Sequence, residues 1–139
     1  MDEELKNLAL EIDYAVEEAN LDTLNALIVI CSEKLQGAVG ENKPILLFLK
    51  ANCYGGLASI HSMEPGYIWS WRQDDKISEI LNLRKAVSDS SFIQLERILQ
   101  CKILTNIGCS LSQLGRFVEA IKLWDESLSV SIQLCYGTW

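Results

Sequence analysis

Residues 103–124, ILTNIGCSLSQLGRFVEAIKLW, decide the fold of this chain. Their apolar side chains recur at helical spacing, yet Gly108 and Gly115 interrupt the pattern. A glycine inside a helix destabilises it by about 1 kcal/mol relative to alanine, so each glycine needs a structural reason. We expect Gly115 to end one helix in a left-handed conformation within the turn LGRF. We expect Gly108 to face the partner helix, where its missing side chain lets the two backbones approach closely.

The partner helix supplies residues that match this arrangement. Ala120 is small and would lie at the close contact, while Phe117, Ile121 and Trp124 would fill the spaces on either side. Residues 92–133 are therefore predicted to form an antiparallel hairpin, with helices at 92–114 and 117–133.

Four more segments carry helical periodicity, at residues 3–18, 22–36, 44–60 and 76–87. We expect Asp22 to cap the second of them and Pro44 to start the third. The fourth has a predicted core side of Ile77, Ile80, Leu81, Leu83 and Ala86. No segment shows sustained β alternation, so the predicted fold class is all-α, a single domain over residues 1–139. Its three hairpins are residues 1–37, 43–88 (with an aromatic insert at 61–75) and 92–133.

Composition and charge exclude several classes of function. The net charge is −7, and residues 1–22 hold eight acidic residues against Lys6 alone. Lysine and arginine are not clustered, so we expect no direct nucleic-acid binding. The acidic helix is expected to be a solvated outer face, or else a docking surface for a basic partner.

Compartment and cysteine chemistry follow from the same sequence. The longest nearly uncharged apolar stretch, 44–60, is shorter than the ~20 residues of a membrane span. The N-terminus lacks the basic start of a signal peptide, so we expect a cytoplasmic protein with no membrane association. The five cysteines are odd in number and lack C-x-x-C spacing, which favours buried side chains over disulfide or metal roles.

The hairpin at 92–133 resembles the tetratricopeptide repeat. Nine residues match that pattern in order and spacing: Leu104, Ile107, Gly108, Leu111, Gly115, Phe117, Ala120, Ile121 and Trp124. The segment FLKANCY is similar to the first half of the same unit, with Ala51 in the place of Gly108. The resemblance implies an α-solenoid of about three stacked hairpins, with residues 1–37 as a divergent N-terminal cap.

A wider resemblance covers residues 42–128 and is strongest at 100–127. The order WSW, ISEILNLRKAV and LERILQCKILTNIGCSLSQLGRFVEAIKLWDESL is similar to the tetratricopeptide-like N-terminal region of bacterial proteins that also carry a HEPN domain. That family implies a ribonuclease of defence or toxin–antitoxin systems, with an arginine shortly before a histidine as its catalytic signature. The sole histidine, His61, has no such arginine. The resemblance therefore carries over the repeat scaffold, and a partial chain of such a ribonuclease is the alternative hypothesis.

We expect no catalysis, metal or cofactor in this chain. His61 has no obvious orienting partner in the sequence, and neither a phosphate-cradling glycine loop nor a nucleophile motif occurs. Adjacent acids such as Asp74 and Asp75 point in different directions on a helix, so they do not converge on a metal.

A binding surface is the better hypothesis. In stacked repeats the first helix of each hairpin lines the concave face, and this resemblance implies a ligand site at Phe48, Asn52, Lys102, Thr105, Asn106 and Gln113. At the positions of Asn52 and Asn106, peptide-binding repeats use asparagine to hold a ligand's backbone or terminal carboxylate. The alternative is that both amides bond neighbouring backbone or water.

Two further surfaces are candidates for interaction. Tyr67, Trp69 and Trp71 in the insert would anchor an interface, or would instead fold back over the hairpin as core. Apolar residues from Val130 to Trp139 would support self-association at the C-terminal end. The predicted function is a non-catalytic module that binds a peptide, a partner protein or a second copy of itself.

Overall fold

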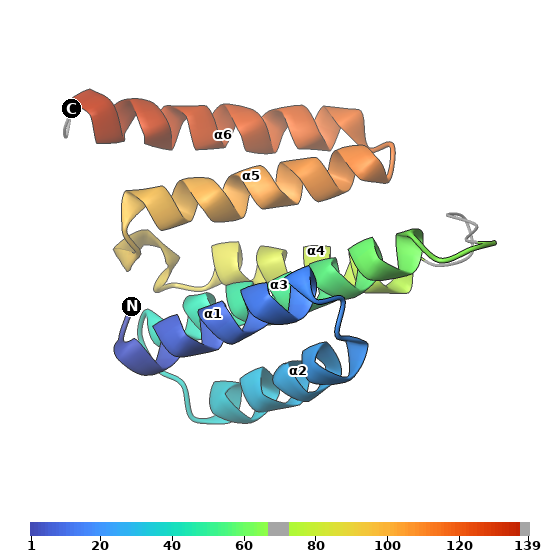
Figure 1. Ribbon diagram of the computed structural model, residues 1–139. Coiled ribbons are helices and arrows are strands. Elements are labelled where there is room, and N and C mark those ends of the chain that lie inside the picture. Colours follow the sequence, from blue (N-terminus) through green and yellow to red (C-terminus); the bar gives the residue numbers. More distant parts are fainter. Residues whose placement is uncertain (67–72, 137–139) are drawn as a thin grey trace.

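The computed structural model describes residues 1–66 and 73–136, and every regular element within them is a helix (Figure 1). The elements are α1 (Glu3–Glu17), α2 (Leu21–Gln36), α3 (Asn42–Ser62), α4 (Asp74–Ser88), the 3₁₀ helix η2 (Phe92–Gln94), α5 (Arg97–Gln113) and α6 (Phe117–Tyr136). The all-α prediction is confirmed. The predicted insert, residues 61–75, is shorter in the structure, because α3 extends to Ser62 and α4 begins at Asp74.

Each helix packs against the next one along the chain, and α1 also packs on α3. Figure 1 shows α5 and α6 side by side at one end of the molecule and α2 at the other, with α3 and α4 between them. The most buried helix is α3, whose residues 44–49 are all buried. The core therefore forms around α3 and continues through α4 into α5.

The start of α2 differs from the prediction. Asn20, not Asp22, is the N-cap, and its side-chain oxygen accepts a hydrogen bond from Thr23 N at 3.0 Å. The preceding Ala19 has φ +53°, and Asn20 N bonds the carbonyl of Ala15. This tight end of α1 brings Asn20 into the capping position and leaves Asp22 in the first turn, where the helix dipole favours a carboxylate.

The predicted helix 92–114 is interrupted. Leu95 and Glu96 are extended, with ψ of 152° and 140°, between η2 and α5. The break lets Phe92 and Leu95 both enter the core. The side chain of Gln100 donates to the Leu95 carbonyl at 2.8 Å, so the freed carbonyl keeps a partner.

Gly115 ends α5 as predicted. Its φ is +79°, Gly115 N bonds Ser112 O at 3.0 Å, and Arg116 N bonds Leu111 O at 2.9 Å. These two bonds satisfy carbonyls that the helix end leaves without partners.

Gly108 marks a close contact, but not the one predicted. A Cβ atom there would lie 2.6 Å from Cδ1 and 3.0 Å from Cε2 of Trp124, so the indole of α6 rather than its backbone occupies the space. Ala120 of α6 is fully buried. Phe117 and Ile121 do not fill gaps in the core, because 63% and 53% of their surfaces are exposed.

The inward face of α4 also differs from the prediction. Ile80, Leu83 and Ala86 are buried, but Ile77 and Leu81 are exposed. The buried arc contains polar residues in their place: Lys76, Glu79 and Asn82. Because α4 packs against both α3 and α5, its buried arc is rotated toward these polar positions.

The Gly108–Trp124 contact predicts a large penalty for a side chain at residue 108. Gly108→Leu should lower the free energy of unfolding by about 1–3 kcal/mol, measured by chemical denaturation. Gly37→Leu is the control, since nothing lies within 4 Å of a Cβ at residue 37. The penalty should shrink when Trp124 is also replaced by alanine. Equal effects at residues 108 and 37 would contradict the contact.

Candidate functional site

A groove of about 620 Å³ runs between α1, α3 and α5, and we call it the α1–α3–α5 groove. Its apolar lining includes Ile12, Phe48 and Leu99. Its polar lining consists of Asp13, Glu17, Asn52, Ser59, Glu79, Lys102 and Asn106. The groove therefore combines apolar surface with a small number of hydrogen-bonding and charged groups, which is typical of binding sites.

The structure brings together four of the six predicted concave-face residues. Phe48 and Asn52 come from α3, and Lys102 and Asn106 come from α5; all four line the α1–α3–α5 groove. Phe48 is buried, so it contributes apolar surface, whereas the two asparagines are half-buried. Neither asparagine side chain has a hydrogen-bond partner within the described part of the chain.

Thr105 is placed differently from the prediction. Its hydroxyl lies 2.8 Å from Ser127 Oγ of α6, and Ser127 Oγ donates to the Cys101 carbonyl at 3.1 Å. Thr105 thus joins α5 to α6 instead of facing the groove. It lies one residue from Asn106, which is about 100° around the helix, so the two side chains point to different neighbours.

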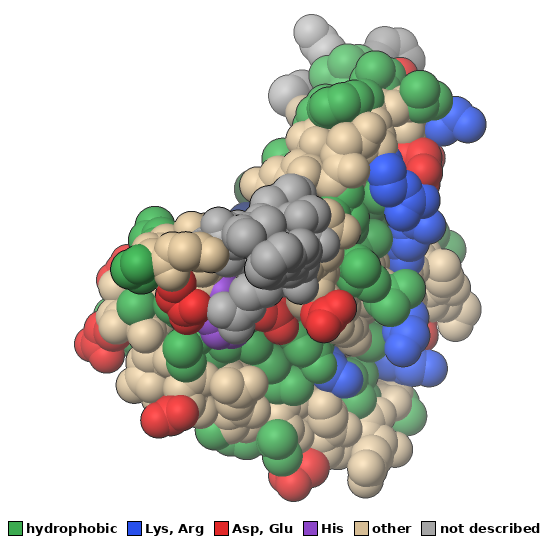
Figure 2. All heavy atoms as spheres, turned by 90° about the vertical axis from the view of Figure 1, so that its right-hand side faces the viewer, with side chains coloured by type: hydrophobic (Ala, Val, Ile, Leu, Met, Phe, Trp, Pro, Cys, Tyr) green, Lys and Arg blue, Asp and Glu red, His purple; other side chains and the backbone are tan. Residues whose placement is uncertain are grey.

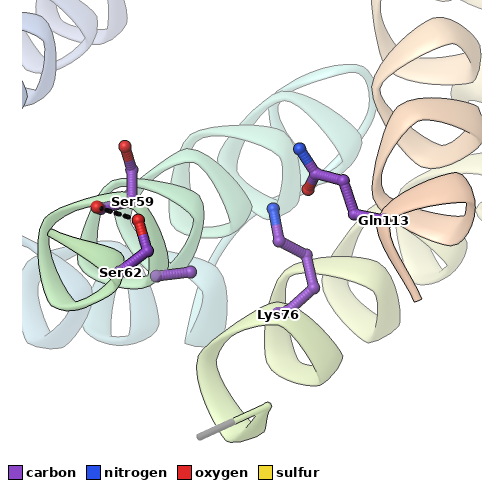
Figure 3. A pocket seen from close by; sticks show the side chains of 5 residues that line it. Ser59, Ser62, Lys76 and Gln113 are labelled. Carbon is purple, nitrogen blue, oxygen red and sulfur yellow. Dashed lines mark hydrogen bonds between the residues drawn. The ribbon is translucent and has the colours of Figure 1, made fainter. Parts of the chain in front are cut away.

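Gln113 lines a second cavity of about 450 Å³, together with Ala58, Ser59, Ser62 and Lys76. Figure 3 shows the side chain of Lys76 in α4 extending into the space between α3 and α5, with its ammonium group next to the side chain of Gln113. Ser59 lines both this cavity and the α1–α3–α5 groove, so the two spaces adjoin.

A buried polar network lies between these spaces. Lys76 Nζ is 3.1 Å from Glu79 Oε2, and Ser110 of α5 donates to Glu79 Oε1. The side chains of Lys76 and Glu79 are each only 11% exposed. The carboxylate therefore joins α4 to α5 at the floor of the groove. Sequence reasoning missed this network, although the Lys–Glu spacing of three residues on a helix was a usable signal.

Two consecutive glycines in α3 make room for the surrounding helices. A Cβ at Gly55 would lie 3.0 Å from Cδ of Glu79, and a Cβ at Gly56 would lie 2.6 Å from Cγ2 of Val16 and 3.2 Å from Cδ1 of Leu24. Gly55 thus admits the buried carboxylate from α4, while Gly56 admits α1 and α2.

His61 does have an orienting partner, contrary to the expectation from sequence. Its Nδ1 lies 3.1 Å from Asp75 Oδ2, and its Nε2 lies 3.8 Å from Glu64 Oε1. The first contact ties the end of α3 to the start of α4. The nearby Ser62 hydroxyl donates to the Ser59 carbonyl. Over residues 1–66 and 73–132, whose side chains the structure describes, no three histidine, cysteine or acidic side chains are grouped so as to hold a metal ion.

The cysteines that the structure describes are free thiols. Cys31 and Cys53 are both fully buried, in α2 and α3. Hydrogen bonding to Cys31, together with burial, raises the pKa of Cys53 well above its ordinary range. Cys53 is therefore a protonated core side chain, whereas Cys109 is exposed on α5.

Although lysine and arginine are not clustered along the sequence, basic side chains gather along one edge of the molecule, as Figure 2 shows. The Glu119 carboxylate of α6 accepts hydrogen bonds from Arg116 and from Arg84 of α4, each at 2.7 Å. Both guanidinium groups hold the pKa of Glu119 below its ordinary value. Arg84 thus takes part in an ion pair between helices.

Tyr67, Trp69 and Trp71 lie outside the described residues, as do Gly137 to Trp139 and the side chains of residues 133–136. Before that point, α6 exposes large apolar side chains at Phe117, Val118, Ile121, Trp124, Leu128 and Ile132. The exposed apolar surface therefore begins earlier in α6 than Val130.

Comparison of the chain with models of protein families, with curated proteins and with solved structures gave no match. Among the described residues, no helix combines the length and the apolarity needed to cross a bilayer. Any assignment of function depends on the residues of the groove themselves.

The buried network predicts a stability effect at Glu79. Glu79→Gln should lower the free energy of unfolding by about 2–3 kcal/mol, because the Lys76 ammonium then lacks its counter-charge in a poorly hydrated site. Adding Lys76→Met should recover part of this loss. Glu119→Gln, which removes a solvent-exposed ion pair, is the control and should lower the free energy of unfolding much less. Equal effects at Glu79 and Glu119 would contradict a buried network.

Proposed function

We propose that this chain is a non-catalytic, cytoplasmic interaction module that binds an extended peptide segment of another protein in the α1–α3–α5 groove. The observation that carries the proposal is the pair of amides, Asn52 and Asn106, which line one groove from two helices and have no partner among the described residues. The order of helix packing supports three stacked hairpins of the tetratricopeptide type. In that arrangement α1, α3 and α5 are the first helices of their hairpins.

The chemistry of the two amides suits a peptide backbone. Each carboxamide offers both a donor and an acceptor, so it can bond the carbonyl and the N–H of an extended chain. Apolar lining from Phe48 and Leu99 would bury alternate side chains of the ligand. The backbone bonds would provide affinity, and the apolar contacts would provide selectivity.

A pool of fluorescein-labelled randomised nonapeptides tests this proposal by fluorescence anisotropy. The wild type should bind the pool, and Asn52→Ala with Asn106→Ala should weaken binding by about tenfold, the loss expected for two hydrogen bonds. Asn7→Ala, on the exposed outer face of α1, is the control and should bind as the wild type does. Unchanged binding in the double variant would reject the groove as the peptide site.

The exposed apolar face of α6 favours a second candidate function, self-association. Phe117, Leu128 and Ile121 are 63%, 59% and 53% exposed on one side of this helix. Contiguous apolar surface of this kind marks association sites in many proteins.

Sedimentation over a range of concentrations tests self-association. Wild type should form a dimer or larger species, and Ile121→Lys with Leu128→Lys should be monomeric at the same concentrations. Lys122→Ala, elsewhere on α6, is the control and should associate as the wild type does. A wild type that is monomeric at all concentrations would rule out this candidate.

A further inference from the structure

The α1 wall of the groove carries two carboxylates without a counter-charge. Asp13 and Glu17 are four residues apart, both are exposed, and both line the groove. Neither forms an ion pair with any residue that the structure describes. Two acids at the start of α1 do form ion pairs, Glu3 with Lys6 at 3.7 Å and Glu4 with Lys34. Glu11 is unpaired among the described residues, like Asp13 and Glu17, but it lies outside the groove lining.

These two carboxylates lie at an unfavourable place in their helix. Like charges four residues apart repel each other on a helix surface. Glu17 is the last residue of α1 and Asp13 lies one turn before it, where the negative end of the helix dipole disfavours carboxylates. The last turn of α1 contains no basic residue. Carboxylates at the C-terminal end of a helix destabilise it when no basic residue lies nearby. Their presence inside a groove therefore points to a functional constraint.

The other charged groups of the groove do not neutralise this wall. Glu79 is paired with Lys76 at 3.1 Å, so it adds no free charge. Lys102 stands on the α5 wall, one turn before Asn106, and has no carboxylate within ion-pairing distance in the described chain. The groove thus presents two free carboxylates on one wall and a single ammonium on another.

We propose that the groove accepts a peptide segment with one lysine or arginine, whose cationic group lies between Asp13 and Glu17. The inference rests on the peptide-binding function proposed above and adds the chemistry of the ligand. Side chains four residues apart on a helix are about 5–6 Å apart at Cβ, so one ammonium or guanidinium group can bond both carboxylates. Asn52 and Asn106 hold the ligand backbone alongside. Lys102 disfavours a second basic residue on the α5 side.

Three oriented pools of labelled nonapeptides test the inference by fluorescence anisotropy. The pools share randomised uncharged flanks and differ only in the central residue, which is lysine, glutamine or glutamate. The lysine pool should bind about tenfold more tightly than the glutamine pool, as expected for charge-assisted hydrogen bonds, and the glutamate pool should bind most weakly. Added salt should reduce the difference between pools.

The matched variants distinguish the effect of the two carboxylates from the effect of the net charge of the protein. Asp13→Asn with Glu17→Gln should make the lysine and glutamine pools bind equally. Glu11→Gln with Glu18→Gln changes the net charge by the same amount at exposed positions outside the groove lining, and should keep the lysine preference. Thermal denaturation should show that both variants remain folded, because each removes charges that make no ion pair in the described structure.

The possible failures are distinguishable. Pools that bind equally well, or a lysine preference that survives Asp13→Asn with Glu17→Gln, would overturn the inference and leave peptide binding intact. No binding of any pool would overturn the proposed function together with the inference. Saturable binding of spermidine that displaces the lysine pool, and that the same two substitutions abolish, would identify a small polyamine as the ligand in place of a peptide.

Discussion

Close packing around α3 fixes both the hydrophobic core and the groove. This helix contacts α1, α2 and α4, and atoms of Glu79, Val16 and Leu24 lie close to its Gly55–Gly56 pair. A glycine pair weakens an isolated helix, so α3 is stabilised by its neighbours more than by its own propensity. Because α3 also carries Phe48 and Asn52, the same packing that fixes the core fixes the floor of the groove.

The buried polar network extends this constraint to α5. The Glu79 carboxylate fits against Gly55 and receives hydrogen bonds from Lys76 and Ser110. A polar group that is buried and fully bonded fixes one relative position of the helices, since any shift leaves a partner unsatisfied. The wall that carries Lys102 and Asn106 is therefore held at a set distance from the wall that carries Asn52. The amides can act together only if this distance is kept.

Helical periodicity was enough to predict six helices and the turn at Gly115, because both depend on local sequence. Other features depend on contacts between segments that are distant in the sequence. The partner of Gly108 is the indole of Trp124 rather than a backbone, which spacing alone cannot distinguish. The face of α4 was assigned from its apolar residues, whereas packing on both α3 and α5 buries Lys76 and Glu79 and exposes Ile77 and Leu81. For the groove, the resemblance placed Asn52 and Asn106 together, but the acidic wall of α1 became visible only once α1 was seen to pack on α3.

The most direct test of peptide binding in the groove is an NMR titration of the ¹⁵N-labelled protein with the tightest-binding lysine-centred nonapeptide. The side-chain amide resonances of Asn52 and Asn106 should shift with a common apparent Kd. Those of Asn7 and Asn25, on exposed faces of α1 and α2, should stay unchanged. Shifts confined to α6, or to the outer face of α4 around Leu81, with no change at Asn52 and Asn106, would show that the ligand binds elsewhere and would contradict peptide binding in the groove.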